Sequence, residues 1–345
     1  GTEKSKEMAD LEVPSNHDTH TSHPLHITAF EENEHFVRTG TLWTATAHVV
    51  TAVIGAGVLS LAWSISQLGW IAGPAIMGVF AVITYYSSCL LADCYKFPDP
   101  VTGPNRNPTY RDAVRLYLGT TKAWLCGLVQ YVSLYGVGIA YTITTSISIR
   151  AIKQSDCYHK NGHGYQCHFS EYTIMILFGL TQVILSQIPN FHNVWGLSVV
   201  AAIMSFAYAS IGAGLGISKV VENGKFYGSI GGISTSTTLS TSQKVWQVLQ
   251  AVGDIAFAYP YSVLVIEIED TLKTKPPENK TMKKASLLVV TATTFFYMLC
   301  SFFGYAAFGE NTPGNLLTGF GFYEPYWLVD FANACIVVHL VGAYQ

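Results

Sequence analysis

The sequence contains long stretches without a single formally charged side chain. Residues 39–92 contain no Asp, Glu, Lys or Arg in 54 positions, and residues 172–218 contain none in 47. Two shorter stretches have the same property, 123–149 and 285–309. A helix needs about 20 mostly apolar residues to cross a bilayer, so each of the two longest stretches can supply two helices and a turn.

Composition excludes several classes of protein. Only 12% of the 345 residues are charged and 50% are apolar, whereas about 25% of a globular chain is usually charged. A soluble domain cannot keep so many uncharged helices away from water. A soluble enzyme, a nucleic-acid binder and a small disulfide-stapled domain are therefore excluded. The sequence predicts an all-α polytopic membrane protein whose main partner is the lipid bilayer.

Eight apolar segments are predicted to span the membrane. They are too long for barrel strands and lack the period-two alternation of such strands. A Gly-Trp pair at Gly69 and Trp70 predicts the turn between the first two. The segments are 41–67, 71–95, 123–149, 171–188, 193–218, 244–268, 285–308 and 325–345.

The segments that flank these helices differ in character. Residues 1–38 are polar and acidic, and we interpret them as a disordered cytoplasmic tail rather than a targeting peptide. Five histidines fall here, but no cysteine joins them, so a solvated tail is favoured over a metal site. Residues 108–119 are either a short amphipathic helix, capped by Thr109 and ended by Gly119, or a plain connector.

Lys and Arg are distributed unevenly between the predicted loops. With the N-terminus inside, 13 of the 19 fall on the cytoplasmic side, which favours a cytoplasmic N-terminus. Cys157 and Cys167 would then lie in an outside loop. They either form a disulfide or are two unpaired cysteines.

Two of the predicted helices contain interruptions. The first segment contains Gly55 and Gly57 near its centre, and the sixth contains Gly253, Asp254 and Pro260. Two interrupted helices five segments apart indicate an inverted-repeat transporter. A second glycine-rich run, at 212–216, is better explained by close helix packing.

Unwound backbone in the bilayer must line a cavity or be buried in protein. Its N–H groups would bind a carboxylate and its carbonyls an ammonium group, so the two interruptions together suit a zwitterion. Tyr131 and Tyr135 share one helical face and could close such a pocket. The candidate substrate-binding residues are Ile54, Gly55, Ala56, Gly57, Val58, Tyr135, Gly253, Asp254 and Phe257.

Proton coupling has three candidate residues. Asp254 is the only acidic residue well inside a predicted span, and such a residue is a functional candidate by default. A structural ion pair and a protonated, hydrogen-bonded carboxyl are its alternative interpretations. His48 and His339 also lie within spans, although a lone buried histidine is usually only hydrogen-bonded. No metal site is predicted.

Four motifs carry a family resemblance. Residues 35–41 (HFVRTGT), 53–63 (VIGAGVLSLAW), 187–192 (QIPNFH) and 253–262 (GDIAFAYPYS) resemble the plant amino acid permeases. These belong to the amino acid/auxin permease family, within the superfamily that has the LeuT-like fold. The resemblance implies a plasma-membrane symporter that moves amino acids inward with protons and needs no other cofactor. Sodium-coupled relatives have Asn where this chain has Thr51, so sodium coupling is not expected.

The chain departs from the family pattern at its C-terminus. The shared core has two repeats of five helices, and residues 39–345 supply one repeat and three helices of the next. We therefore expect a C-terminally truncated transporter domain or a fragment. The alternatives are a transport-inactive relative that regulates a full-length permease partner, and an auxin or lysine-histidine carrier. An intramembrane aspartyl protease would need a second mid-span Asp, so the chain is not expected to be an enzyme.

Overall fold

The computed structural model describes residues 38–162, 167, 169–187, 195–235, 239–259, 261–321 and 325–344. The predicted tail lies outside these ranges except for Arg38, as do Pro260 and most of the motif at 187–192. The described residues therefore belong to the predicted transmembrane domain.

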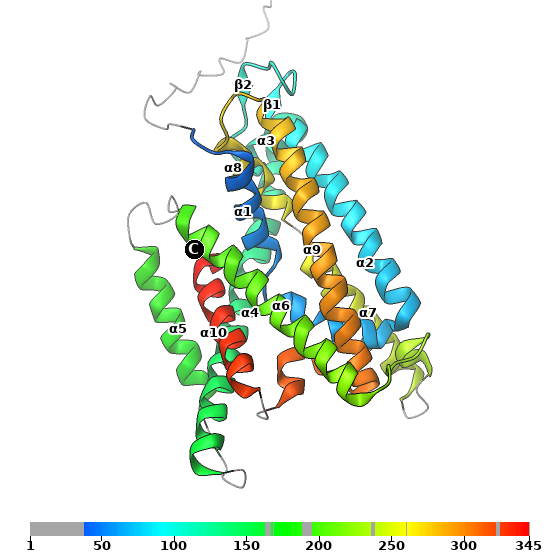
Figure 1. Ribbon diagram of the computed structural model, residues 1–345. Helices are drawn as coiled ribbons and strands as arrows, with labels where there is room; N and C mark the ends of the chain where they lie inside the picture. The colour runs from blue at the N-terminus through cyan, green and yellow to red at the C-terminus, as the bar shows by residue number, and fades with distance from the viewer. Residues whose placement is uncertain are drawn as a thin grey trace, which may run out of the picture. The chain divides into compact units, whose positions relative to one another are not determined.

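Helices make up nearly all the regular structure of the described residues (Figure 1). The α-helices are α1 (Leu42–Val53), α2 (Leu61–Asp93), α3 (Tyr110–Leu118), α4 (Thr120–Asn161), α5 (Glu171–Ser186), α6 (Trp195–Asn223), α7 (Thr241–Ala258), α8 (Val265–Asp270), α9 (Glu278–Phe308) and α10 (Tyr326–Tyr344). The 3-10 helices are η1 (Ala56–Leu59), η3 (Gly232–Thr235), η4 (Ser262–Leu264), η5 (Gly309–Asn311) and η6 (Leu316–Phe320). The strands β1 (Lys96–Phe97) and β2 (Asn105–Arg106) form one antiparallel hairpin.

The all-α polytopic fold is confirmed. Six of the described helices are long and apolar enough to cross a membrane. The first two predicted segments follow each other without a loop, because α2 combines the end of the first with the whole of the second. Gly69 turns the chain between them with φ +84°, and a Cβ there would clash with the carbonyl of Ile230. The turn therefore requires glycine.

The third predicted segment was too short. α4 continues to Asn161, twelve residues beyond the end of the uncharged stretch. Charged side chains are accommodated on this extension because they are exposed and can pair along the helix, as Lys160 does with Asp156 at 2.8 Å. A disulfide joins Cys157 of the extension to Cys167.

The helices pack around one large apolar core. α2 runs along α9, and α6 packs against both α9 and α10 (Figure 1). α1 packs against α6 and α9. Large apolar side chains also cover outer surfaces: Val82, Val132 and Ile184 are each between 65% and 68% exposed. Such surfaces on three different helices suit contact with lipid.

One end of the helices gathers more than half of the described charged side chains, and we call residues 38–40, 93–119 and 267–284 the basic end. It lies at the top of Figure 1, around β1, β2, α3 and α8. The amphipathic helix predicted here is confirmed as α3. The Thr109 hydroxyl accepts from the Asp112 N–H, and Gly119 ends the helix with φ +85°.

Backbone hydrogen bonds join α1 to α8 at the basic end. The Gly40 N–H donates to the Thr271 carbonyl at 2.9 Å, and the Lys273 N–H donates to the Gly40 carbonyl at 3.0 Å. A Cβ on Gly40 would lie 2.6 Å from the Thr271 oxygen. The close approach of the two backbones therefore depends on glycine.

Side chains reinforce this junction. The Arg38 guanidinium pairs with the Asp270 carboxylate at 2.9 Å. The Tyr95 hydroxyl donates to the same carboxylate oxygen at 2.7 Å. Burial raises the pKa of Tyr95, and its bond to Asp270 raises that pKa further, so the hydroxyl remains a donor.

Candidate functional site

The first predicted span is broken, as expected from its glycines. α1 ends at Val53, Gly55 has an extended backbone, and η1 follows before α2 begins at Leu61. Ile54 and Val58 are fully buried. The first N–H groups of η1 have no acceptor within their own helix, as at any helix N-terminus. We call residues 54–60 the first break.

The sixth span is also broken, but at one end of the predicted stretch only. Gly253 and Asp254 lie inside the continuous helix α7, which ends at Ala258. η4 and α8 then resume the span, and we call residues 259 and 261–264 the second break. The cost of one glycine in a helix, about 1 kcal/mol, is too small to unwind α7. A proline has no backbone N–H to continue a helix, so its place at 260 in the sequence accounts for the end of α7.

The first break packs against the end of α7. A Cβ built on Gly57 would lie 3.8 Å from the Cβ of Ala258. The Tyr297 hydroxyl of α9 lies 2.6 Å from the Val53 carbonyl and 2.9 Å from the Ala258 carbonyl. It thus connects the last turn of α1 with the last turn of α7. Because a hydroxyl has one proton, it donates to one of these carbonyls at a time.

A second group of side chains binds the Ile54 carbonyl. The Tyr208 and Ser205 hydroxyls of α6 both lie 2.8 Å from this oxygen. Ser205 is also 2.8 Å from Nδ1 of His339 on α10. His339 is fully buried, and its Nε2 has no hydrogen-bond partner among the described residues. His339 therefore contacts the first break through Ser205 rather than directly.

Asp254 lies on α7 one turn before the second break. Its carboxyl group lies near Ser64, a fully buried residue in the first turn of α2 whose hydroxyl donates to the Ser60 carbonyl at 3.4 Å. The carboxyl therefore lies between the helix that follows the first break and the helix that precedes the second. This position agrees with a role at the breaks, although Gly253 beside it does not unwind.

Three other predicted site residues are not buried at the breaks. Tyr135 is 74% exposed on α4 and Phe257 is 55% exposed on α7, so neither is buried between the breaks. Tyr141, further along α4, approaches the first break instead: its hydroxyl would lie 3.9 Å from a Cβ on Gly55. His48 is partly buried on α1, more than one turn before the break.

Sequence reasoning missed the hydroxyl donors Tyr297, Tyr208 and Ser205. Each lies in the middle of an uncharged predicted span. A buried hydroxyl needs a partner in the bilayer, and an unwound backbone needs donors. A search for mid-span hydroxyls to pair with the predicted break would have found them as candidates, together with many others.

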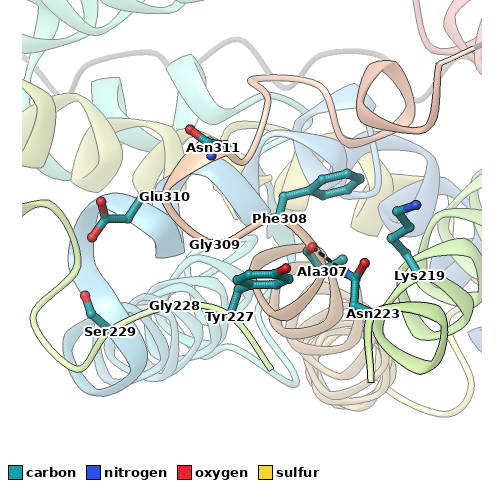
Figure 2. Close-up of a pocket in the computed structure, with 10 residues that line it drawn as sticks. All are labelled: Lys219, Asn223, Tyr227, Gly228, Ser229, Ala307, Phe308, Gly309, Glu310 and Asn311. Atoms are coloured by element: carbon teal, nitrogen blue, oxygen red, sulfur yellow. Dashed lines mark hydrogen bonds between the residues drawn. The ribbon is translucent and has the colours of Figure 1, made fainter. Parts of the chain in front are cut away.

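Open cavities lie elsewhere in the structure. Figure 2 shows one of about 530 Å³ where the ends of α6 and α9 meet, lined by Lys219, Asn223, Tyr227, Phe308 and Glu310. The Asn223 amide crosses it to donate to the Ala307 carbonyl at 3.0 Å. The breaks themselves are closed, because Val53, Ile54, Ala258 and Tyr259 are all buried. A ligand can enter between the breaks only if they separate.

Comparison with known proteins identifies the family. The model of the family described as "Transmembrane amino acid transporter protein" matches residues 38–345. The chain is 59% identical to Amino acid permease 6 of Arabidopsis thaliana over 318 residues, which cover 92% of this chain and 66% of that protein. It is 58% identical to Amino acid permease 2 of the same plant, covering 92% and 64% of the two chains.

A more distant relative gives a contrast. The chain is 29% identical to Lysine histidine transporter-like 1 of Arabidopsis thaliana over 307 residues, which cover 88% of this chain and 63% of the relative. The chain thus spans just under two thirds of the length of each of these three relatives. Sequence motifs, paired helix breaks and the family match agree: this chain belongs to the transmembrane amino acid transporter protein family.

Proposed function

We propose that this chain is a proton-coupled symporter that imports amino acids across the plasma membrane, with its basic end and N-terminus on the cytoplasmic side. The observation that carries the proposal is the contact between two broken helices, with Tyr297 bonded to both. Unwound backbone that meets at one point within a membrane helix bundle is the arrangement expected of a transporter's binding site.

The amino acid substrate would bind where the breaks separate. The backbone N–H groups of Ala56 and Gly57 would take its carboxylate, because those of Ile54, Gly55 and Val58 already donate to carbonyls of the chain. The carbonyls of Val53 and Ala258 would take its ammonium group. The Tyr297 hydroxyl approaches both carbonyls with a single proton, and the Ala258 carbonyl has no backbone N–H donor among the described residues. A cation with several N–H donors would satisfy both carbonyls at once.

Asp254 would carry the coupled proton. A carboxylate at membrane depth is costly unless it is paired or protonated, and the polar side chain beside Asp254 is the neutral Ser64 hydroxyl. A proton bound from the outside medium would neutralise it, and loss of that proton on the cytoplasmic side would favour return of the carrier. His48 and His339 are the rival proton carriers. His339 reaches the first break through Ser205.

Two alternatives are tested together with this proposal. The second candidate is a transport-inactive chain that regulates a full-length permease. A lysine-histidine or auxin carrier is less well supported, because identity to Lysine histidine transporter-like 1 is 29% against 59% for Amino acid permease 6.

The test is uptake of labelled amino acids by transporter-deficient cells at acidic and neutral outside pH. Wild type should concentrate amino acid more strongly at acidic pH. Asp254→Asn preserves shape but removes titration, so it should retain exchange and lose pH-driven accumulation. An Asn variant that accumulates substrate with the wild-type pH dependence would make Asp254 structural. Uptake that appears only on co-expression with a full-length permease would favour the regulatory alternative.

A further inference from the structure

A buried carboxyl at the basic end is not used by the mechanism above. Glu269, in the last turn of α8, is 0% exposed. Both of its carboxyl oxygens lack a hydrogen-bond partner among the described residues. Its neighbours on α8 are different: Glu267 accepts from the Tyr110 N–H at 3.1 Å, and Asp270 pairs with Arg38.

The lysines near Glu269 are already paired with other acids. Lys96 lies 2.7 Å from Glu278, whose side chain is 1% exposed. Lys283 lies 2.5 Å from Asp93 at the end of α2. These pairs, with the Arg106–Glu278 pair and the Asn279–Asp93 hydrogen bond, fasten the first turns of α9 to α2 and the β-hairpin. We call this group the basic-end network: Asp93, Lys96, Arg106, Glu278, Asn279 and Lys283.

Titratable groups approach Glu269 from each side of the network. The end of α2 and the residues after it supply Asp93, Cys94 and Lys96, and α9 supplies Glu278 and Lys283. Arg38, which precedes α1, is held by Asp270, and on the α3 side Glu267 is bound to the Tyr110 backbone. The two acids of the network repel a negative charge on Glu269, while the two lysines are each engaged elsewhere.

An ionised carboxylate in this position would have no donor and no counter-ion of its own. Burial of such a charge costs several kcal/mol, and proteins usually avoid the cost by neutralising the group. Among the described residues, no three His, Cys, Asp or Glu side chains converge in a way that could hold a metal ion. The ligand that these surroundings accommodate is therefore a proton.

We propose that Glu269 is a proton-binding site at the basic end, separate from Asp254, and that its proton keeps the basic-end network intact. When the O–H bond of Glu269 breaks and the proton leaves to the adjacent aqueous side, the new carboxylate competes for the ammonium groups of Lys96 and Lys283. Any Lys–Glu269 pair forms at the expense of the Lys96–Glu278 or Lys283–Asp93 pair. Loss of the proton thus loosens the attachment of α9 to α2.

The proton site does not depend on transport. Only its use during import rests on the proposed function: there the Glu269 proton would act as a pH-sensitive latch, which holds α9 to α2 while the proton is bound. The first test therefore measures the carboxyl itself. Infrared difference spectra of the purified chain in nanodiscs, wild type minus Glu269→Gln at neutral pH, should contain the C=O stretch of a protonated carboxylic acid. A carboxylate band in its place would overturn the proposal.

Thermal stability supplies the second measurement. Glutamine has the shape of the protonated acid and cannot ionise, so the apparent melting temperature of wild type should fall relative to Glu269→Gln as pH rises from mildly acidic to mildly alkaline. The matched control is Glu310→Gln, an exposed acid at the opposite end (Figure 2), which should follow wild type at every pH. A Glu269→Gln chain that is less stable than wild type at every pH, or does not fold, would show that the charge is required and the proposal is wrong.

Transport separates this proposal from the previous one. Preloading cells to different internal pH should change the uptake rate of wild type more steeply than that of Glu269→Gln, because the variant keeps only the response that comes from release of the Asp254 proton. Both should keep their response to outside pH. A Glu269→Gln variant with the wild-type response to internal pH would refute the latch. Failure of pH-driven accumulation in wild type itself would refute proton-coupled import. The infrared and stability measurements would then still show whether Glu269 binds a proton.

Discussion

The hydroxyl of Tyr297 offers a direct test of how the two breaks are held together. Tyr297→Phe removes the group that lies 2.6 Å from the Val53 carbonyl and 2.9 Å from the Ala258 carbonyl. The phenyl ring keeps its edge-to-face contact with Tyr259, whose centroid is 5.3 Å away. The substitution therefore isolates the hydrogen bonds from the packing.

The magnitude follows from what each carbonyl retains. The Val53 carbonyl still accepts from the Gly55 N–H at 2.8 Å. The Ala258 carbonyl has no backbone N–H donor among the described residues. One buried carbonyl is thus left unsatisfied, which costs about 1–3 kcal/mol. We expect Tyr297→Phe to destabilise the chain by that amount and to weaken amino acid uptake, because the breaks lose their common contact.

The assay is the apparent melting temperature of the chain purified in detergent, followed by uptake in cells. Tyr135→Phe is the matched control, since its hydroxyl is removed from a side chain that is 74% exposed. It should melt with wild type. If Tyr297→Phe melts with this control and transports normally, the hydroxyl does not hold the breaks together.

Three further predictions concern the glycines and the topology. Gly57→Ala should retain uptake, because its Cβ would make an ordinary 3.8 Å contact with Ala258, whereas Gly57→Leu should abolish uptake at normal surface expression; wild-type affinity in the Leu variant would exclude the site. Gly253→Ala should retain uptake and stabilise α7 by about 0.5–1 kcal/mol, because nothing lies within 4 Å of the added Cβ; loss of uptake at normal expression would show that this glycine must unwind. A cysteine placed near Lys280 should react with an impermeant maleimide only after permeabilisation and one near Lys225 should react in intact cells; the reverse pattern would invert the topology.

Local chemistry decided which features the sequence could predict. The first break was found because two glycines in an apolar helix are a local signal. Helix α3 was found because its cap, Thr109, and its stop, Gly119, directly flank the helix in the sequence. The second interruption was predicted over Gly253, Asp254 and Pro260 together, but α7 continues through Gly253, because one glycine costs a helix far less than a proline. Tyr135 was chosen by helical spacing, but which face of α4 meets the breaks depends on packing against other helices. The pairing of Tyr297 with two carbonyls depends on contacts over 244 and 39 residues, which no local pattern encodes.

The backbone junction between α1 and α8 restricts how the molecule can open. The two short helices are hydrogen-bonded to each other at the basic end through Gly40, Thr271 and Lys273, and each is connected to the rest of its span by a break. The hydrogen bonds couple the two helices, so a movement of one is expected to carry the other with it. A side chain introduced at Gly40 would clash with the Thr271 carbonyl and separate the two backbones. The coupling would then be lost without any change at residues 54–60.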